Sequence, residues 1–211
     1  WSASDGRPGG CARGPRAMTA VPYPTWYLHR WHLLPEGYMS DRGVDLYGRL
    51  VTPLYYQLSE RRVLEAVVRE LRDAGEILDM GCGPGHLLRA LRNRRPAPRS
   101  TGVDLSPYML ERAAAVSPGG ATLVHADSSD TPFPAESFDA VAALHHLGHV
   151  PAPAALAILG EAHRILRPGG RLLVLDHRWH DEPRGPFAQG PSRLVPPGLS
   201  RLRVLLKAMP R

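Results

Sequence analysis

The chain has 211 residues, of which 43% are hydrophobic, and this is enough for one domain with a sizeable core. Its formal net charge of +6 comes almost wholly from arginine, since Lys207 is the only lysine; a solvated surface is the favoured interpretation, and a surface for nucleic acid or anionic membrane is the alternative. No apolar run approaches the roughly 20 residues of a membrane span. Neither of the two cysteines suggests a disulfide framework, so we expect a cytoplasmic protein.

The first 58 residues differ in composition from the rest. Residues 1–17 are rich in Gly, Pro and Arg and lack periodicity, which predicts a disordered leader ahead of Met18. Residues 18–58 carry most of the aromatic side chains, interrupted by prolines and glycines. This composition predicts short helices and turns. Two interpretations stay open, a lid over a substrate pocket and a cap that packs on the core.

The first predicted helix spans residues 61–73, and a glycine-rich stretch follows it. The apolar run 77–80 predicts a strand, and Gly81, Gly83 and Gly85 follow it directly. The leucines at 87, 88 and 91 then lie on one face of a predicted helix. Glycines at a strand-to-helix turn permit left-handed backbone and close approach of a ligand to the main chain. The stretch therefore predicts a site for a nucleotide-type ligand.

Strands and helices alternate through the rest of the domain. The further predicted strands are 101–104, 121–125, 138–144 and 171–176, and the further predicted helices are 107–116 and 155–166. Ser106 and Pro107 have the residue types of an N-cap and a first helical position, and 168–170 would stop the last helix. The alternation predicts an α/β fold with a doubly wound, mostly parallel sheet and helices on both faces.

Chemistry-bearing side chains recur where these strands end. Asp79, Asp104, Asp127 and the pair His145-His146 lie at or near the predicted carboxyl ends. Ligands of doubly wound sheets bind at that edge, where the strand order reverses. The shared placement predicts one site there.

The spacing of the glycines distinguishes between classes of nucleotide. A dinucleotide fingerprint needs Gly-x-Gly-x-x-Gly, and here His86 occupies the third glycine position. Instead Asp79 precedes Gly81, Gly83 and Gly85 in the order acid-x-Gly-x-Gly-x-Gly, which resembles the class I S-adenosylmethionine-dependent methyltransferases. Stretches that resemble later motifs of this family follow in its order at 102–110, 126–127, 132–141 and 166–176. The resemblance covers about residues 60–178.

The resemblance implies a Rossmann-like fold, S-adenosylmethionine as methyl donor and S-adenosylhomocysteine as product. It places Gly81, Gly83 and Gly85 against the methionine part of the donor, with Asp79 organising the loop, and it places Asp104 on the ribose hydroxyls. Leu105, Asp127 and Ser128 would contact the adenine. The cofactor-binding residues implied are Asp79, Gly81, Cys82, Gly83, Gly85, Asp104, Leu105, Asp127, Ser128 and Leu144. For Cys82 we favour a small residue filling the turn over a reactive thiol.

Catalysis and acceptor are less determined. His145 and His146 are candidate general bases, and a structural turn at 144–147 is the favoured alternative; metal binding with His149 is disfavoured, so no metal is expected. The motifs look most like the small-molecule branch that includes ubiquinone and menaquinone C-methyltransferases, which implies a small, quinone-like or other hydrophobic acceptor. An Asn-Pro-Pro-Tyr-type motif is absent after the fourth strand, which disfavours nucleic acid. An RNA methyltransferase and a non-catalytic or truncated cofactor-binding remnant stay open.

The C-terminal part departs from the family pattern. We assign residues 59–180 to the methyltransferase domain and 181–211 to a Pro/Gly-rich segment with a terminal amphipathic helix. The basic side of that helix suits peripheral contact with anionic lipid, and packing on the sheet is the favoured alternative. The family's antiparallel hairpin is expected to be missing or truncated. The sequence leaves the oligomeric state open.

Overall fold

The computed structural model describes residues 21–28, 34, 36–52 and 60–176. Within these ranges five parallel strands form one sheet in the order β3-β2-β1-β4-β5. The strands are β1 (Glu76–Met80), β2 (Arg99–Asp104), β3 (Thr122–His125), β4 (Phe138–Leu144) and β5 (Leu166–Leu175). The predicted fold class is confirmed, and the order reverses between β1 and β4, as in a doubly wound sheet.

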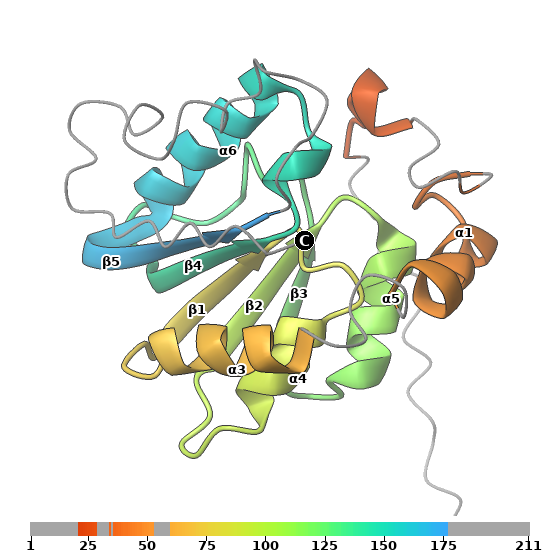
Figure 1. Ribbon diagram of the computed structural model, residues 1–211. Helices are drawn as coiled ribbons and strands as arrows, with labels where there is room; N and C mark the ends of the chain where they lie inside the picture. Colours follow the sequence, from red (N-terminus) through yellow and green to blue (C-terminus); the bar gives the residue numbers. More distant parts are fainter. Residues whose placement is uncertain (1–20, 29–33, 35, 53–59, 177–211) are drawn as a thin grey trace, which may run out of the picture.

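Helices cover both faces of this sheet (Figure 1). They are α3 (Glu60–Glu70), α4 (His86–Arg92), α5 (Pro107–Val116) and α6 (Ala152–Ile165). Figure 1 shows α6 on one face and α3 with α4 on the other. The pleat of β1 explains both cores: Leu78 packs in the cluster that contains Ile158 of α6, and Ile77 packs in the cluster that contains Leu87 of α4. β1 is therefore buried on both sides, as the middle of a parallel sheet requires.

The start of α5 follows its sequence signal closely. Ser106 has extended backbone, its hydroxyl accepts a hydrogen bond from the Met109 N–H, and Pro107 is the first helical residue. This is the N-cap arrangement expected from the Ser-Pro pair. Because Ser106 lies only two residues after the end of β2, the cap also sets the direction in which the chain leaves the sheet.

The end of α6 differs from the expectation. The predicted helix includes Leu166, but α6 ends at Ile165, and Leu166 has extended backbone and pairs with Phe138 as the first residue of β5. A proline disfavours helical backbone in the residue that precedes it, which here is Arg167. Pro168 therefore ends the helix earlier than the glycines at 169 and 170 would. Pairing with β4 then buries the Leu166 side chain, which is 6% exposed.

The N-terminal segment contains short helical pieces, η1 (Thr25–Leu28), α1 (Asp41–Leu46) and the π-helical η3 (Tyr47–Val51). It is tied to the sheet domain by the Ser106 hydroxyl, which donates to the Tyr38 carbonyl, and by ion pairs from Arg112 to Asp41 and Asp45. The predictions for residues 1–17 and 181–211 and for the hairpin lie outside the described residues. Within the described ranges, none of the helices is both long enough and apolar enough to cross a bilayer.

Candidate functional site

A cavity lies at the carboxyl ends of β1, β2 and β4, where the strand order reverses. The N-terminal segment contributes Trp26, Tyr27, Tyr38 and Tyr47 to its wall. Of the twelve residues predicted for the site, eleven line the cavity: Asp79, Gly81, Cys82, Gly83, Asp104, Leu105, Asp127, Ser128, Leu144, His145 and His146. Gly85 is the exception.

The glycine loop between β1 and α4 has left-handed backbone at all three glycines, with φ of 67° at Gly81, 50° at Gly83 and 81° at Gly85. Residues with a Cβ atom rarely adopt such backbone conformations, so the local conformation explains why these three positions are glycines. Gly85 is the N-cap of α4, and a Cβ on it would come within 2.9 Å of Cα of Ala113 in α5. The structure thus gives Gly85 a role in packing α4 on α5 instead of a place in the cavity wall.

Asp104, at the end of β2, connects the loop to the start of α5. One carboxylate oxygen accepts from the Gly83 N–H and the other from the Ser106 N–H, each at 2.8 Å. Burial raises the pKa of this carboxyl group, and the two backbone donors act in the opposite direction. Each carboxylate oxygen can accept more than one hydrogen bond, so the group can hold the loop and still accept from a ligand hydroxyl.

Asp79 lies beside Asp104 in the same wall and is only 3% exposed. No described residue donates a hydrogen bond to its carboxylate, and burial together with the charge of Asp104 raises its pKa to about 8. A buried acid of this kind costs free energy when it ionises. A ligand that carries a positive charge into the cavity would offset that cost, so the pair of carboxylates favours a cationic group.

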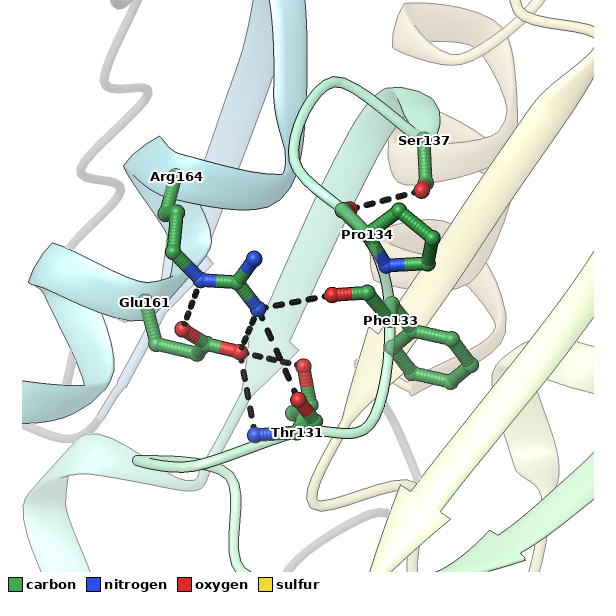
Figure 2. Close-up of polar contacts among 6 residues, drawn as sticks. All are labelled: Thr131, Phe133, Pro134, Ser137, Glu161 and Arg164. Carbon is green, nitrogen blue, oxygen red and sulfur yellow. Dashed lines mark hydrogen bonds and ion pairs between the residues drawn. The ribbon is translucent and has the colours of Figure 1, made fainter.

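Asp127 and Ser128 reach the cavity from the loop after β3. The Ser129 N–H and hydroxyl both donate to one Asp127 oxygen at 2.8 Å, and these bonds hold the turn. Further along this loop the Glu161 carboxylate of α6 accepts from the N–H and hydroxyl of Thr131 and from Arg164, which also donates to the Phe133 carbonyl (Figure 2). We call Thr131, Glu161 and Arg164 the α6 clamp. It holds the loop that presents Asp127.

Aromatic rings form the part of the wall that the N-terminal segment contributes. Tyr38 and Tyr47 meet edge to face at 5.5 Å between ring centroids, and Trp26 meets Tyr27 in the same manner at 5.8 Å. Burial, and secondarily neighbouring charges, raise the pKa of Tyr27 and Tyr38 well above the ordinary value, so both hydroxyls stay protonated at any working pH. The described residues of this segment both pack on the domain and line the cavity.

The histidine pair follows β4. His145 has left-handed backbone with φ of 52°, which is uncommon for a residue with a side chain. Its N–H donates to the Leu175 carbonyl at 2.6 Å, and the Gly148 N–H donates to the Asp176 carboxylate at 2.5 Å. These bonds to the end of β5 hold the turn from both sides. Both histidines thereby face the same cavity as the carboxylates.

Cys82 is a buried free thiol, and burial with the nearby charges of Asp104 and Asp79 raises its pKa. A raised pKa removes the thiolate that a reactive cysteine needs. A Cβ on Gly102 would come within 2.8 Å of the Cys82 sulfur, so the side chain fills the space between loop and strand. This agrees with the interpretation of Cys82 as a small filling residue.

Sequence reasoning missed some of the wall and all of the α6 clamp. His86, Met109 and Val150 line the cavity, although their sequence positions indicate only a helix start, a helix face and a loop. His86 directly follows the glycine stretch, and this adjacency was the one available signal. The clamp joins residues 30 positions apart, which no local pattern reveals.

Comparisons with known proteins point in one direction. The profile of a family described as methyltransferase domain matches residues 77–170. A demethylmenaquinone methyltransferase of Tropheryma whipplei is 34% identical over 177 residues, which cover 83% of this chain and 72% of that protein. A ubiquinone/menaquinone biosynthesis C-methyltransferase of Syntrophotalea carbinolica is 35% identical over 72% of this chain, and the chain spans 64% of that relative, just under two thirds of its length.

A solved structure supports the same relationship. The amino pentose methyltransferase CalS10 of Micromonospora echinaspora, solved with S-adenosylmethionine bound, is 29% identical, with a TM-score of 0.50 over 57% of this chain and 51% of that chain. The matched part corresponds to the size of the sheet domain.

Proposed function

The chain belongs to the class I S-adenosylmethionine-dependent methyltransferase family, and we propose on that basis that it transfers a methyl group from S-adenosylmethionine to a small-molecule acceptor. The observation that carries the proposal is the convergence of Asp79, Asp104 and Asp127 with the glycine loop on one cavity. Three acids at three strand ends match the three polar parts of such a donor, its ammonium, its ribose and its adenine.

The donor-binding roles follow from what each group can accept. Asp104 accepts from the ribose hydroxyls with the lone pairs that Gly83 and Ser106 leave open. Asp79 offers a buried carboxylate to the ammonium group, and its cost of ionisation falls when that cation arrives. Asp127 and Ser128 accept from the adenine amine, and Leu105 packs on its ring. Cys82 and Leu144 complete the wall.

The residues then have to align an acceptor and remove a proton. When bound, the donor supplies a methyl group activated by its sulfonium, so the protein contributes orientation and a dry site. The aromatic wall excludes water and offers flat apolar surface. Of the histidines that line the cavity, His145 and His146 are the candidate general bases if the acceptor is an acid.

For the acceptor we propose a small hydrophobic molecule, with a quinone-like ring as the leading class. The rings of Trp26, Tyr27, Tyr38 and Tyr47 suit a planar acceptor. Two relatives are named as a ubiquinone/menaquinone biosynthesis C-methyltransferase and a demethylmenaquinone methyltransferase. We further propose the division into 18–58 and 59–180 as cap and catalytic domain, and a cytoplasmic location.

Calorimetry with S-adenosylmethionine tests the proposal directly. The parent chain is expected to bind the donor, and Asp104→Ala is expected to weaken binding at least a hundredfold, because it removes the ribose acceptor and the anchor of the Gly83 N–H. Glu111→Gln, an exposed site on α5, is the control and should bind like the parent. No binding by the parent chain would sink the proposal.

Incubation with labelled donor and a cell extract tests transfer itself. Label is expected in a small organic-extractable product. Label that disappears after nuclease treatment would instead support RNA methylation, and donor binding with no labelled product in any fraction would support the non-catalytic alternative.

A further inference from the structure

The space that a side chain would occupy on Gly81 is filled by a histidine. A Cβ built on Gly81 would lie 2.4 Å from Nδ1, 2.5 Å from Cγ and 2.9 Å from Cε1 of His146. Real Cβ atoms essentially never come within 3.0 Å of such atoms. Because Cγ is the root of the imidazole ring, the ring cannot make room by moving its far end. The imidazole therefore rests on the backbone of the first loop glycine.

The other two loop glycines lack side chains for different reasons. A Cβ on Gly83 would meet nothing within 4 Å, and a Cβ on Gly85 would meet Ala113 of α5. Gly81 alone of the three is covered by a residue that also lines the cavity. The contact joins segments that follow β1 and β4, the two strands on either side of the switch point.

The histidine is held in place from the other side. The turn at 145–148 is bonded to the end of β5 through the His145 N–H and through the Gly148 N–H, which donates to Asp176. On the far side of Gly81 the loop is held by Asp104, which accepts from the Gly83 N–H. The loop thus lies between two supports, a carboxylate from β2 and an imidazole presented by the turn after β4.

We infer that His146 is a positioning residue, whose ring packs on Gly81 and holds the glycine loop in the shape that binds the donor. The inference rests on the proposed function. It gives His146 a role that needs the flat shape of the imidazole and does not need its proton. Loss of the ring should weaken donor binding and raise the donor KM, whereas loss of a general base should lower kcat.

A double-mutant cycle tests the contact. Gly81→Ala is expected to weaken S-adenosylmethionine binding at least tenfold in the parent chain, and by no more than about threefold in the His146→Ala background, where the covering ring is gone. The strain of alanine in left-handed backbone is present in both backgrounds and cancels. Gly83→Ala is the matched control, because nothing covers Gly83 and His146→Ala should not rescue it. An effect of Gly81→Ala that is as large in the His146→Ala background as in the parent would overturn the inference.

Thermal unfolding of the ligand-free variants gives the same cycle without relying on binding. The midpoint should fall in Gly81→Ala and recover in the double variant. If Gly81→Ala does not fold, the inference requires the double variant to fold, and an unfolded double variant contradicts it. Failure of the parent to bind the donor would overturn the proposed function. The unfolding midpoints would then still show whether His146 packs on Gly81.

A third variant separates positioning from catalysis. His146→Phe keeps a flat ring over Gly81 and cannot take a proton. Its donor KM is expected to stay within about threefold of the parent, whereas His146→Ala should raise the donor KM about tenfold. A kcat that falls a hundredfold in both variants at unchanged KM would show a base and overturn the positioning role.

Discussion

At the scale of single residues, the site depends on carboxyl groups that are buried, where their ionisation costs free energy. Asp79 and Asp104 are both buried and lie in one wall, and burial raises the pKa of each. Asp104 is stabilised as an anion by two backbone donors, whereas Asp79 receives no hydrogen bond from any residue that the structure describes. The ligand-free protein therefore carries a group whose ionisation opposes folding. Such strain at a site is what a cationic ligand can relieve.

The effect of pH follows from the direction of the Asp79 shift. Its folded pKa of about 8 lies above the ordinary value of 3.8, so between these values the folded state holds a proton that the unfolded state has lost. Stability from this group is complete below pH 4 and is lost as the pH rises toward 8. Asp79→Asn, which cannot ionise, should therefore raise the midpoint of the ligand-free protein at pH 8, by about 2–4 °C per kcal/mol gained.

The same substitution should weaken donor binding at least tenfold, because the ammonium loses its carboxylate. Thermal scans across pH and calorimetry at pH 8 measure the two effects. Glu111→Gln, at an exposed position, is the control for loss of one negative charge. A midpoint that falls in Asp79→Asn at pH 8 would contradict the assignment of this acid as strained.

At the scale of elements, the loop from β3 to β4 contributes Asp127 and Ser128 to the cavity wall, and the α6 clamp holds this loop. Glu161 is 8% exposed and collects donors from Thr131 and Arg164. These donors outweigh burial and hold the pKa of the Glu161 carboxyl below its ordinary value. Helix α6, which covers one face of the sheet, thus fixes the loop that carries Asp127 (Figures 1 and 2).

Removing the charge of the clamp should loosen that loop. Glu161→Gln is expected to lose about 1–3 kcal/mol of unfolding free energy, because hydrogen bonds to a charged acceptor become neutral ones. The loss should be present above pH 5 and shrink in acid, where the parent glutamate is protonated too. Denaturant unfolding at pH 7 and pH 3 measures this. Glu136→Gln, an exposed acid of the same loop, should match the parent, and an equal loss there would remove the case for the clamp.

At the scale of the whole molecule, the N-terminal segment and the sheet domain meet at the cavity. The Tyr38 carbonyl accepts a hydrogen bond from the Ser106 hydroxyl, and Arg112 forms ion pairs with Asp41 and Asp45. The Tyr23 hydroxyl lies 3.1 Å from Nε2 of His125 at the end of β3. Both parts also line the cavity, so a ligand bound there would contact both. We therefore expect both parts to be stabilised together.

Thermal scans with the donor test this coupling. At a concentration about 100 times its Kd, S-adenosylmethionine should add about 2.7 kcal/mol, which corresponds to a rise of about 5–10 °C in one transition. NADH at the same concentration is the control and should cause no rise. Two transitions of which only one responds to the donor would contradict the coupling.

Much of this architecture is readable from the sequence because its causes are local. Hydrophobic period and Gly/Pro breaks located every strand of the sheet, with boundary errors such as Leu166, which pairs with Phe138. The glycines with left-handed backbone and the acids that end strands were found in the same way. Parallel topology then brings the strand ends to one edge, so local patterns were enough to gather eleven of the twelve predicted residues.

Only the tertiary structure decided what each of these residues touches. That His146 covers Gly81, that Gly85 meets Ala113 and that Glu161 holds Thr131 depends on the register of strands and the packing of helices far apart in the chain. Sequence patterns report the direction of a side chain relative to its own element. They do not report which distant element fills the space beside it, because that choice is made by the packing of the whole core.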